Sequence, residues 1–330
     1  MTKAIPILAL LLLFPSGSAP AEEPDSIAAA AAALFAEAES YREEGDHSEA
    51  ADLYEDLVDD FPSAPQAPLA LLGWGECLER DDDLYGAFLV YQRILDDYPG
   101  QADLNEILQR QLQIGETFLG GRQRLLLFFR IRSGLGTAEE IFETMVKTAP
   151  FSQVAPLAQF NLARAIQMDG RYREAEVEYD HLLEIYAGSK VIPEALFQKG
   201  LCAYELSRGP NYEQIDTERA LKVLDAFLER YPEHEHVAAA EGMREELRHR
   251  LARREYQIAR FYESRDDALG AVVYYRTVVE KYPESDLATE AQAAIARLGD
   301  QAARQQKLLD ALAEPEEDEE PQRILEERDL

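Results

Sequence analysis

A six-fold internal repeat is the feature that most constrains the fold of this 330-residue chain. In each copy an alanine is followed four positions later by an aromatic residue or leucine, and in five copies a proline stands eight positions further on. The pairs are Ala50 with Tyr54, Ala87 with Tyr91, Ala138 with Phe142, Ala175 with Tyr179, Ala220 with Leu224 and Ala271 with Tyr275. In four copies a small residue precedes the alanine by twelve positions, at Ala38, Gly75, Ala163 and Ala259. Self-similarity of this kind predicts a stack of helix pairs.

The residue types explain how each copy folds. The small residue lets two paired helices approach closely, and the aromatic side chain fills the gap between neighbours. The proline ends the second helix, because it has no N–H to donate and restricts the residue before it. One copy has Ala187 where the proline would stand.

These features resemble the tetratricopeptide repeat, a helix–turn–helix unit of about 34 residues. The resemblance implies an all-α fold, a superhelix of about six repeats with two insertions. We expect this solenoid over residues 22–312, with N-terminal repeats in 25–150 and C-terminal repeats in 151–312.

Residues 1–21 are expected to be a signal peptide. Lys3 precedes the apolar run 4–14, and Ala19 and Ala21 form the small-residue site after which we place cleavage. The alternative is an uncleaved anchor, although the run is about half of the ~20 residues that a spanning helix needs. No cysteine lies near this site, so the acceptor of a lipoprotein signal is not seen. We therefore expect a protein of the periplasm, associated with the outer membrane.

The chain is strongly acidic, with a formal net charge of -31. This charge repels nucleic acid and anionic lipid, so the expected partners are proteins, and membrane contact is expected to be indirect or peripheral. Residues 313–330 include nine acidic and two basic side chains and are expected to form a disordered, solvated tail.

The sequence predicts neither an enzyme nor a cofactor site. It contains no G-x-S-x-G, P-loop or Gly-rich dinucleotide turn, and the repeats use nearly all of the mature length. Only His234 and His236 lie close together among the histidines, in a turn between repeats. Two ligands do not make a zinc site, so no metal site is predicted.

The two cysteines, Cys77 and Cys202, hold equivalent places in helices three repeats apart. A disulfide requires Cα atoms within about 7 Å, and several helix layers separate these two positions. The pattern favours two small buried residues over a disulfide.

The concave face of a repeat superhelix is lined by first helices, and this face is the candidate binding surface. In the first two repeats it predicts a client-peptide groove of Phe35, Glu39, Arg42, Leu72, Glu76 and Glu79. In the last repeat the corresponding partner-facing residues are Tyr256, Arg260, Glu263 and Arg265. The competing interpretation makes them ordinary surface residues of the solenoid.

Two insertions interrupt the repeats. The first, over residues 120–134, places four arginines around five consecutive apolar residues. It is either a docking finger for a partner or lipid, or a segment that folds back over an apolar helix end. The finger residues are Arg122, Arg124, Leu126, Phe128, Phe129, Arg130 and Arg132. The second insertion spans residues 207–216, where Asp216 or Thr217 is expected to cap the following helix.

Three segments of the later chain resemble the BamD family of outer-membrane assembly proteins. They are the polar insertion and repeat over 209–232, the long helix expected over 241–267, and the closing segment 272–291. The matching positions are Glu255, Ala259, Tyr262, Ala271, Tyr275 and Pro283. The resemblance implies that C-terminal repeats bind the POTRA domains of a BamA-like barrel, and that N-terminal repeats hold segments of unfolded outer-membrane proteins.

One departure from that family is the missing cysteine after the signal, which the family uses for lipid anchorage. The alternative is a soluble periplasmic adaptor of cell-wall synthesis that resembles CpoB. CpoB-like proteins carry a coiled coil before their repeats, and no such heptad run precedes the first repeat here. This difference favours the BamD interpretation.

Overall fold

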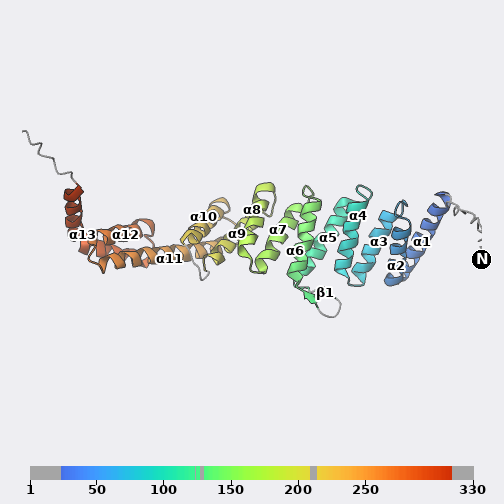
Figure 1. Cartoon of the computed structure of the whole chain (residues 1–330), viewed down its shortest axis with the longest axis horizontal. Helices are drawn as coiled ribbons and strands as arrows, with labels where there is room; N and C mark the ends of the chain where they lie inside the picture. Colours follow the sequence, from blue (N-terminus) through green and yellow to red (C-terminus); the bar gives the residue numbers. More distant parts are fainter. Residues whose placement is uncertain (1–23, 123, 127–129, 209–213, 314–330) are drawn as a thin grey trace, which may run out of the picture. The chain divides into compact units, whose positions relative to one another are not determined.

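The computed structural model describes residues 24–122, 124–126, 130–208 and 214–313. Within these ranges the chain forms thirteen helices and two short strands (Figure 1). It divides into two compact units at Ala158 and Gln159, a boundary that falls inside helix α7. The predicted signal peptide (1–21) and acidic tail (313–330) lie outside the described residues, except for Ala313 at the end of α13.

The helices form six consecutive pairs, which confirms the all-α tetratricopeptide-repeat fold predicted from the sequence. The first unit contains α1 (Pro24–Glu44), α2 (His47–Asp60), α3 (Ala67–Arg80), α4 (Leu84–Asp97), α5 (Leu104–Leu119), β1 (Arg124–Leu126), β2 (Arg130–Arg132) and α6 (Gly134–Thr148). The chain continues with α7 (Ala155–Met168), α8 (Tyr172–Ile185), α9 (Ile192–Leu206), α10 (Gln214–Arg230), α11 (Val237–Glu263), α12 (Ala268–Lys281) and α13 (Asp286–Ala313). Helix α13 packs on α12 and follows the last repeat.

The repeat residues form the core of each helix pair. All six alanines of the second helices are completely buried, and the residues four positions later are buried beside them. The small residue of the first helix makes room for this second side chain. A Cβ atom at Gly75 would lie 2.3 Å from the Tyr91 ring, and one at Gly115 would lie 2.6 Å from the Phe142 ring. The residues that recur at fixed spacing in the sequence are therefore residues that contact one another in each helix pair.

The second helices end two residues before the repeat proline. The residue between the helix and the proline, such as Phe61 or Tyr98, has φ near -128° and leaves the helical region. Helix α8 ends in the same way at Ile185, although Ala187 replaces the proline there. In the turn that follows α8, the amide of Ser189 donates to the carbonyl of Tyr186, the first residue after the helix, at 2.8 Å. The turn thus forms with or without proline.

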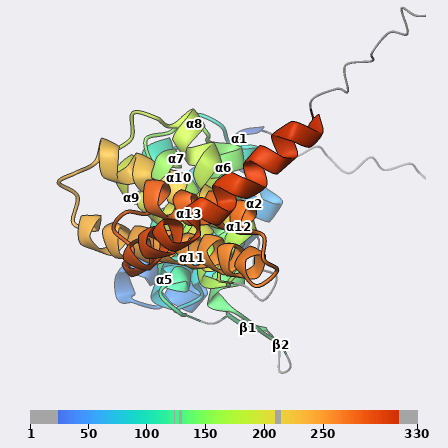
Figure 2. The ribbon, with the colours of Figure 1, turned by 90° about the vertical axis from the view of Figure 1, so that its left-hand side faces the viewer.

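The first insertion contains a short β-hairpin, which the sequence analysis did not predict. Strands β1 and β2 pair antiparallel, with Arg124 opposite Arg132 and Leu126 opposite Arg130. The hairpin stands out from α5 and α6 (Figure 2). Its two ends meet at Gly134, where an added Cβ would lie 2.1 Å from the carbonyl oxygen of Arg122. Only glycine fits such a close backbone approach.

Both cysteines are free and completely buried in first helices, Cys77 in α3 and Cys202 in α9. Burial disfavours the charged thiolate and raises the pKa of Cys77 to about 11 and that of Cys202 to about 12. Neither thiol is therefore poised for reaction at neutral pH.

No helix within the described ranges combines the length and the apolar character needed to cross a lipid bilayer.

Candidate functional site

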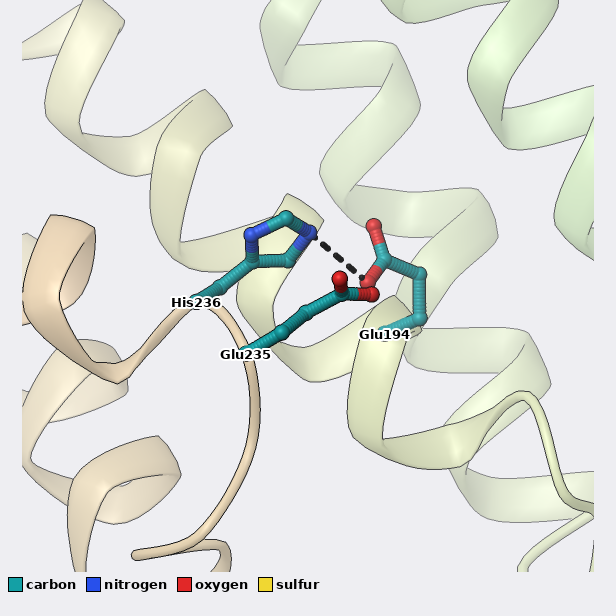
Figure 3. Close-up of side chains that lie close together, drawn as sticks. All are labelled: Glu194, Glu235 and His236. Atoms are coloured by element: carbon teal, nitrogen blue, oxygen red, sulfur yellow. Dashed lines mark ion pairs between the residues drawn. The ribbon is translucent and has the colours of Figure 1, made fainter.

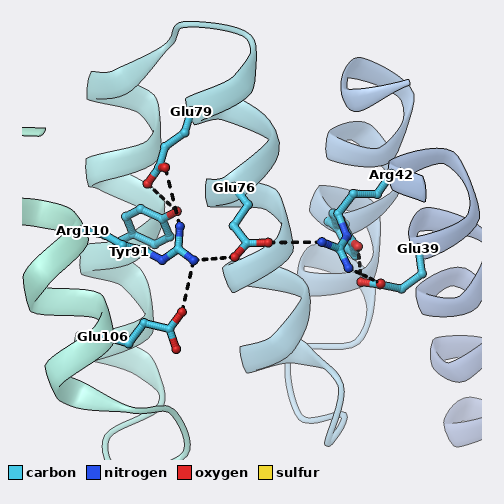
Figure 4. A network of polar contacts seen from close by, with 8 residues as sticks. Glu39, Arg42, Glu76, Glu79, Tyr91, Glu106 and Arg110 are labelled. Atoms are coloured by element: carbon cyan, nitrogen blue, oxygen red, sulfur yellow. Dashed lines mark hydrogen bonds and ion pairs between the residues drawn. The ribbon is translucent and has the colours of Figure 1, made fainter. Parts of the chain in front are cut away.

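Charged side chains connect the first helices of the N-terminal unit across neighbouring repeats (Figure 4). Arg42 Nη1 of α1 lies 3.3 Å from Glu76 Oε2 of α3, and Arg110 Nη2 of α5 lies 2.6 Å from Glu76 Oε1. Each pair is separated by 34 residues. Arg42 also binds Glu39, and Arg110 binds Glu79 and Glu106. We call Glu39, Arg42, Glu76, Glu79, Glu106 and Arg110 the N-terminal charge ladder.

Repeat tyrosines attach this ladder to the core. Tyr91 Oη donates to Glu79 Oε1 at 2.8 Å, and Tyr54 Oη donates to Glu39. Burial and these acidic acceptors raise the pKa of both tyrosines. For Glu39, burial raises the pKa, but hydrogen bonds from Arg42 and Tyr54 outweigh burial and lower it overall. The Glu39 carboxylate is therefore held charged beside the first-helix surface.

A pocket of about 360 Å³ opens between the ladder residues. It is lined by Arg42, His47, Glu76, Cys77, Glu79, Arg80 and Arg110. Among the described residues, the buried Nε atoms of Arg42 and Arg110 have no hydrogen-bond partner. The pocket therefore places the guanidinium groups of Arg42 and Arg110 next to two carboxylates, those of Glu76 and Glu79, a suitable pattern for the polar backbone of a peptide.

The structure brings four of the six predicted groove residues together. Glu39, Arg42, Glu76 and Glu79 all belong to the ladder. Their side chains already have partners within the protein, since Arg42 binds Glu39 and Glu76 and the repeat tyrosines bind Glu39 and Glu79. Phe35 packs against the Tyr54 ring with centroids 5.9 Å apart, and Leu72 is half-buried in α3. Arg110, which binds Glu76 and Glu79, is not among the predicted groove residues. The signal was present, since Arg110 follows Glu76 by the same 34 residues that separate Glu76 from Arg42.

The C-terminal unit repeats the 34-residue spacing. Arg297 Nη1 lies 2.7 Å from Glu263 Oε1, and Tyr256 Oη donates to Glu290 Oε2 at 2.9 Å. Hydrogen bonds from Arg297 and then Tyr275 lower the pKa of Glu263. Glu263 thus binds Arg297 and Tyr275 of the same chain, and its role as a partner-facing residue stays a prediction.

The other predicted C-terminal residues line or adjoin a second cleft, of about 510 Å³, which we call the C-terminal cleft. Its lining residues are His249, Arg253, Tyr256, Gln257, Arg260, Ser285, Asp286 and Leu287. Arg260 is exposed there, whereas Arg265 lies outside the cleft and places its guanidinium 4.4 Å from the Phe261 ring centroid. Tyr256 and Arg260 are therefore the predicted residues that face this cleft.

The histidines of the turn before α11 meet Glu194 at the start of α9, and Figure 3 shows His236 and Glu235 beside this residue. His236 Nε2 lies 3.2 Å from Glu194 Oε2, and ligand atoms of Glu194, Glu235 and His236 all lie within 4.8 Å of one another. The His236 ring stacks on Phe197 at 4.2 Å, and His234 Nδ1 accepts from the His236 amide at 3.4 Å. These contacts give the cluster a structural role, since they fix the turn on α9.

The predicted finger is described in part. Arg122 forms an ion pair with Asp82 and donates to the Asp82 carbonyl at 3.0 Å, which holds the base of the hairpin on the turn between α3 and α4. Arg124, Leu126, Arg130 and Arg132 belong to the two strands, and Phe128 and Phe129 lie outside the described residues.

Comparison with known proteins agrees with this architecture. Residues 32–64 and 69–100 match a tetratricopeptide-repeat model, and residues 132–309 match the YfiO model, described as an outer membrane lipoprotein. The outer membrane protein assembly factor BamD of Caulobacter vibrioides is 26% identical over 160 residues, which cover 48% of this chain and 52% of that protein. The chain thus matches about half the length of this curated relative.

Solved structures with similarity include the tetratricopeptide-repeat protein YrrB, described as having an unusual peptide-binding site. It is 13% identical, with a TM-score of 0.34, and the match covers 63% of this chain and 90% of that one. A tetratricopeptide-repeat protein of Parabacteroides merdae is also 13% identical, with a TM-score of 0.34 and coverage of 80% and 98%.

The YfiO match extends from the end of the hairpin to residue 309 in α13 and includes the C-terminal cleft and its charged pairs. Since this match spans more than half of the chain, the protein belongs to the YfiO family of outer membrane lipoproteins, the BamD-like tetratricopeptide-repeat proteins.

Proposed function

We propose that the protein is a binding scaffold, not a catalyst, in the assembly of outer-membrane β-barrels in the periplasm. The observation that carries this proposal is the family match over residues 132–309, together with the relative named as an outer membrane protein assembly factor. The repeats supply the surface, since within each compact unit the stacked first helices add their side chains to a shared face.

In this proposal the C-terminal cleft binds a POTRA domain of a BamA-like barrel protein. Tyr256 and Arg260 line a cleft of about 510 Å³ and come from α11, while Asp286 and Leu287 come from the start of α13. An aromatic ring, an exposed guanidinium and an apolar side chain in one cleft match the residue types that dominate protein interfaces.

The N-terminal pocket holds a segment of an unfolded client protein in the same proposal. The guanidinium groups of Arg42 and Arg110 suit backbone carbonyls of an extended peptide, and the carboxylates of Glu76 and Glu79 beside them suit its N–H groups. Because the ladder residues also stabilise the repeats, recognition here uses groups that folding has already positioned. The hairpin is a separate docking element in this proposal, because its strands lead away from α5 and α6 (Figure 2).

The test is site-specific crosslinking in intact cells. A photoreactive amino acid at Gln257, an exposed residue of the C-terminal cleft, is expected to capture a POTRA-bearing barrel protein. The same residue at Arg276, exposed on α12 outside the cleft, is the matched control. Capture at position 257 is expected to disappear with Arg260→Glu and to persist with Arg276→Glu.

Glu263 is left unchanged in this experiment because its replacement would remove contacts to Arg297 and Tyr275. Capture of cell-wall synthases in place of barrel components would reject the proposal in favour of the CpoB-like adaptor. Equal capture from positions 257 and 276 would reject the cleft as the binding site.

A further inference from the structure

Helix α11 concentrates positive charge in a strongly acidic protein. Five arginines occur within the eleven residues from Arg244 to Arg254, whereas the whole chain has 33 lysines and arginines in 330 residues. Two of the five have partners outside α11, since Arg244 lies 3.8 Å from Asp225 of α10 and Arg248 binds Glu284 in the turn between α12 and α13. The other three face a common groove.

That groove has a volume of about 550 Å³ and runs between the end of α9 and the middle of α11. Its lining residues are Ser207, Arg208, Arg250, Arg253, Arg254 and Gln257. We call it the arginine groove. No carboxylate lines it among the described residues, although acidic side chains outnumber basic ones by 64 to 33 in the chain.

The charges in the arginine groove are only partly neutralised. Arg208 lies 3.2 Å from Glu205, and Arg250 binds Glu246 while donating to Ser207 Oγ at 3.4 Å. Within the described part of the chain, Arg253 and Arg254 have no ion pair. Four guanidinium groups with two acidic partners leave a local excess of positive charge, which attracts a segment rich in carboxylates.

The chain itself contains such a segment. Residues 314–330 carry nine acidic and two basic side chains, and six of the seven residues from Glu314 to Glu320 are acidic. Strong opposite charge at two places in one chain favours their association, because the covalent link raises the effective concentration of each for the other.

The acidic segment is long enough to reach the arginine groove from the end of α13. Gln305 accepts a hydrogen bond from the Leu269 amide and donates to the Asp266 carbonyl, both at 2.8 Å, which places this part of α13 beside the turn after α11. From Gln305, α13 extends about 12 Å to its end, and α11 covers about 9 Å from Glu263 back to Gln257. Seventeen residues reach up to about 56 Å when extended, so the segment is long enough.

We propose that the acidic C-terminal segment, residues 314–330, docks in the arginine groove of the same molecule. Its carboxylates pair with Arg253 and Arg254 first, since these two guanidinium groups lack partners among the described residues. The docking does not depend on the proposed role in barrel assembly. Only the effect of this docking on POTRA binding depends on that role, because Arg253 and Gln257 also line the cleft proposed for the POTRA domain.

Distance measurement between two spin labels in the full-length chain tests this proposal. One label is attached at Glu241→Cys, exposed on α11 outside the groove, and the other at Gln322→Cys. The native thiols are buried, so labelling selects the two new cysteines. Docking predicts a population shorter than about 30 Å, since Glu241 lies about 18 Å along the helix from Arg253.

Removing the charges of the groove is expected to abolish the short population. Arg253→Gln combined with Arg254→Gln is the test variant, and Arg230→Gln combined with Arg276→Gln is the control with the same change in net charge. Neither control arginine lines the groove. Salt at 1 M is expected to act like the test variant, because the Debye length then falls to about 3 Å.

Three results would overturn the proposal. The first is a distance distribution that the test variant leaves unchanged, and the second is one that both variants change equally. The third is a short population that disappears when labelled chains are diluted with unlabelled ones, since this would assign the groove to the acidic segment of a second copy.

Discussion

Replacing Gly75 by alanine is expected to destabilise the second repeat, because α3 and α4 touch where the new methyl group would lie. The added Cβ would stand 2.3, 2.7 and 2.8 Å from three atoms of the Tyr91 ring, all inside van der Waals contact. Tyr91 is completely buried and donates a hydrogen bond to Glu79, so the ring has no free space into which it can move.

The expected magnitude follows from three opposing effects. Overpacking a core costs about 1–3 kcal/mol, and a displaced Tyr91 hydroxyl would lose about 1 kcal/mol of hydrogen bonding. The better helix propensity of alanine returns about 1 kcal/mol. We expect a net loss of about 2 kcal/mol, which lowers the urea midpoint by about 1 M for a slope near 2 kcal/mol/M.

The assay is urea unfolding followed by the fluorescence of Trp74, the single tryptophan of the chain and the neighbour of Gly75. Gly242→Ala in α11 is the matched control, because an added Cβ there meets nothing within 4 Å. This control is expected to gain about 1 kcal/mol, measured by circular dichroism. A Gly75→Ala protein as stable as the unmodified chain would refute the packing argument.

Further predictions concern the stability provided by the charge ladder, the turn after α8, and the effect of low pH on stability. Arg110→Ala is expected to cost about 1–3 kcal/mol in urea unfolding because it removes one partner from each of three glutamates. Arg93→Ala, whose partners Asp59 and Asp97 are exposed, is expected to cost at most about 0.5 kcal/mol, and equal losses would contradict the ladder. Ala187→Pro is expected to be neutral or to stabilise by up to about 1 kcal/mol, since α8 already ends at Ile185, and a lowered melting temperature would speak against this. The lowered pKa values of Glu39, Glu246 and Glu263 predict stability that is complete above their ordinary pKa of 4.5 and is lost as the pH falls through the lowered values. Melting temperatures between pH 6 and pH 3 test this point, and the decline should be smaller in Glu263→Gln.

Much of the fold could be predicted from the sequence because the repeat residues report direct contacts. An alanine, an aromatic residue and a small residue at fixed spacing suffice to pair α3 with α4, since Gly75 receives the ring of Tyr91. The hairpin could not be predicted in this way. Its strands have three residues each, too few for an alternating pattern, and the requirement for Gly134 comes from a backbone contact with Arg122.

The candidate sites were less predictable for a different reason. Sequence periodicity indicates which helix face a residue occupies, but not which charges on that face bind each other. Glu263 was expected to face a partner, and it binds Arg297 in the next first-helix position, 34 residues later. Arg110 was missed because the insertion after α5 disturbs the alignment of the third repeat. A search for opposite charges 34 residues apart would have found both pairs.

The two buried thiols have a consequence for how the chain is made. Once folded, neither Cys77 nor Cys202 offers sulfur to an oxidant, so the native protein has no redox-sensitive surface cysteine among the described residues. Before folding both are open, and in an oxidising compartment an unfolded chain forms disulfides within seconds to hours. The order of events therefore matters, since a bridge formed early would join positions that the native core keeps as separate free thiols. Rapid local closure of each helix pair, typical of folds rich in short-range contacts, is expected to protect the chain during this interval.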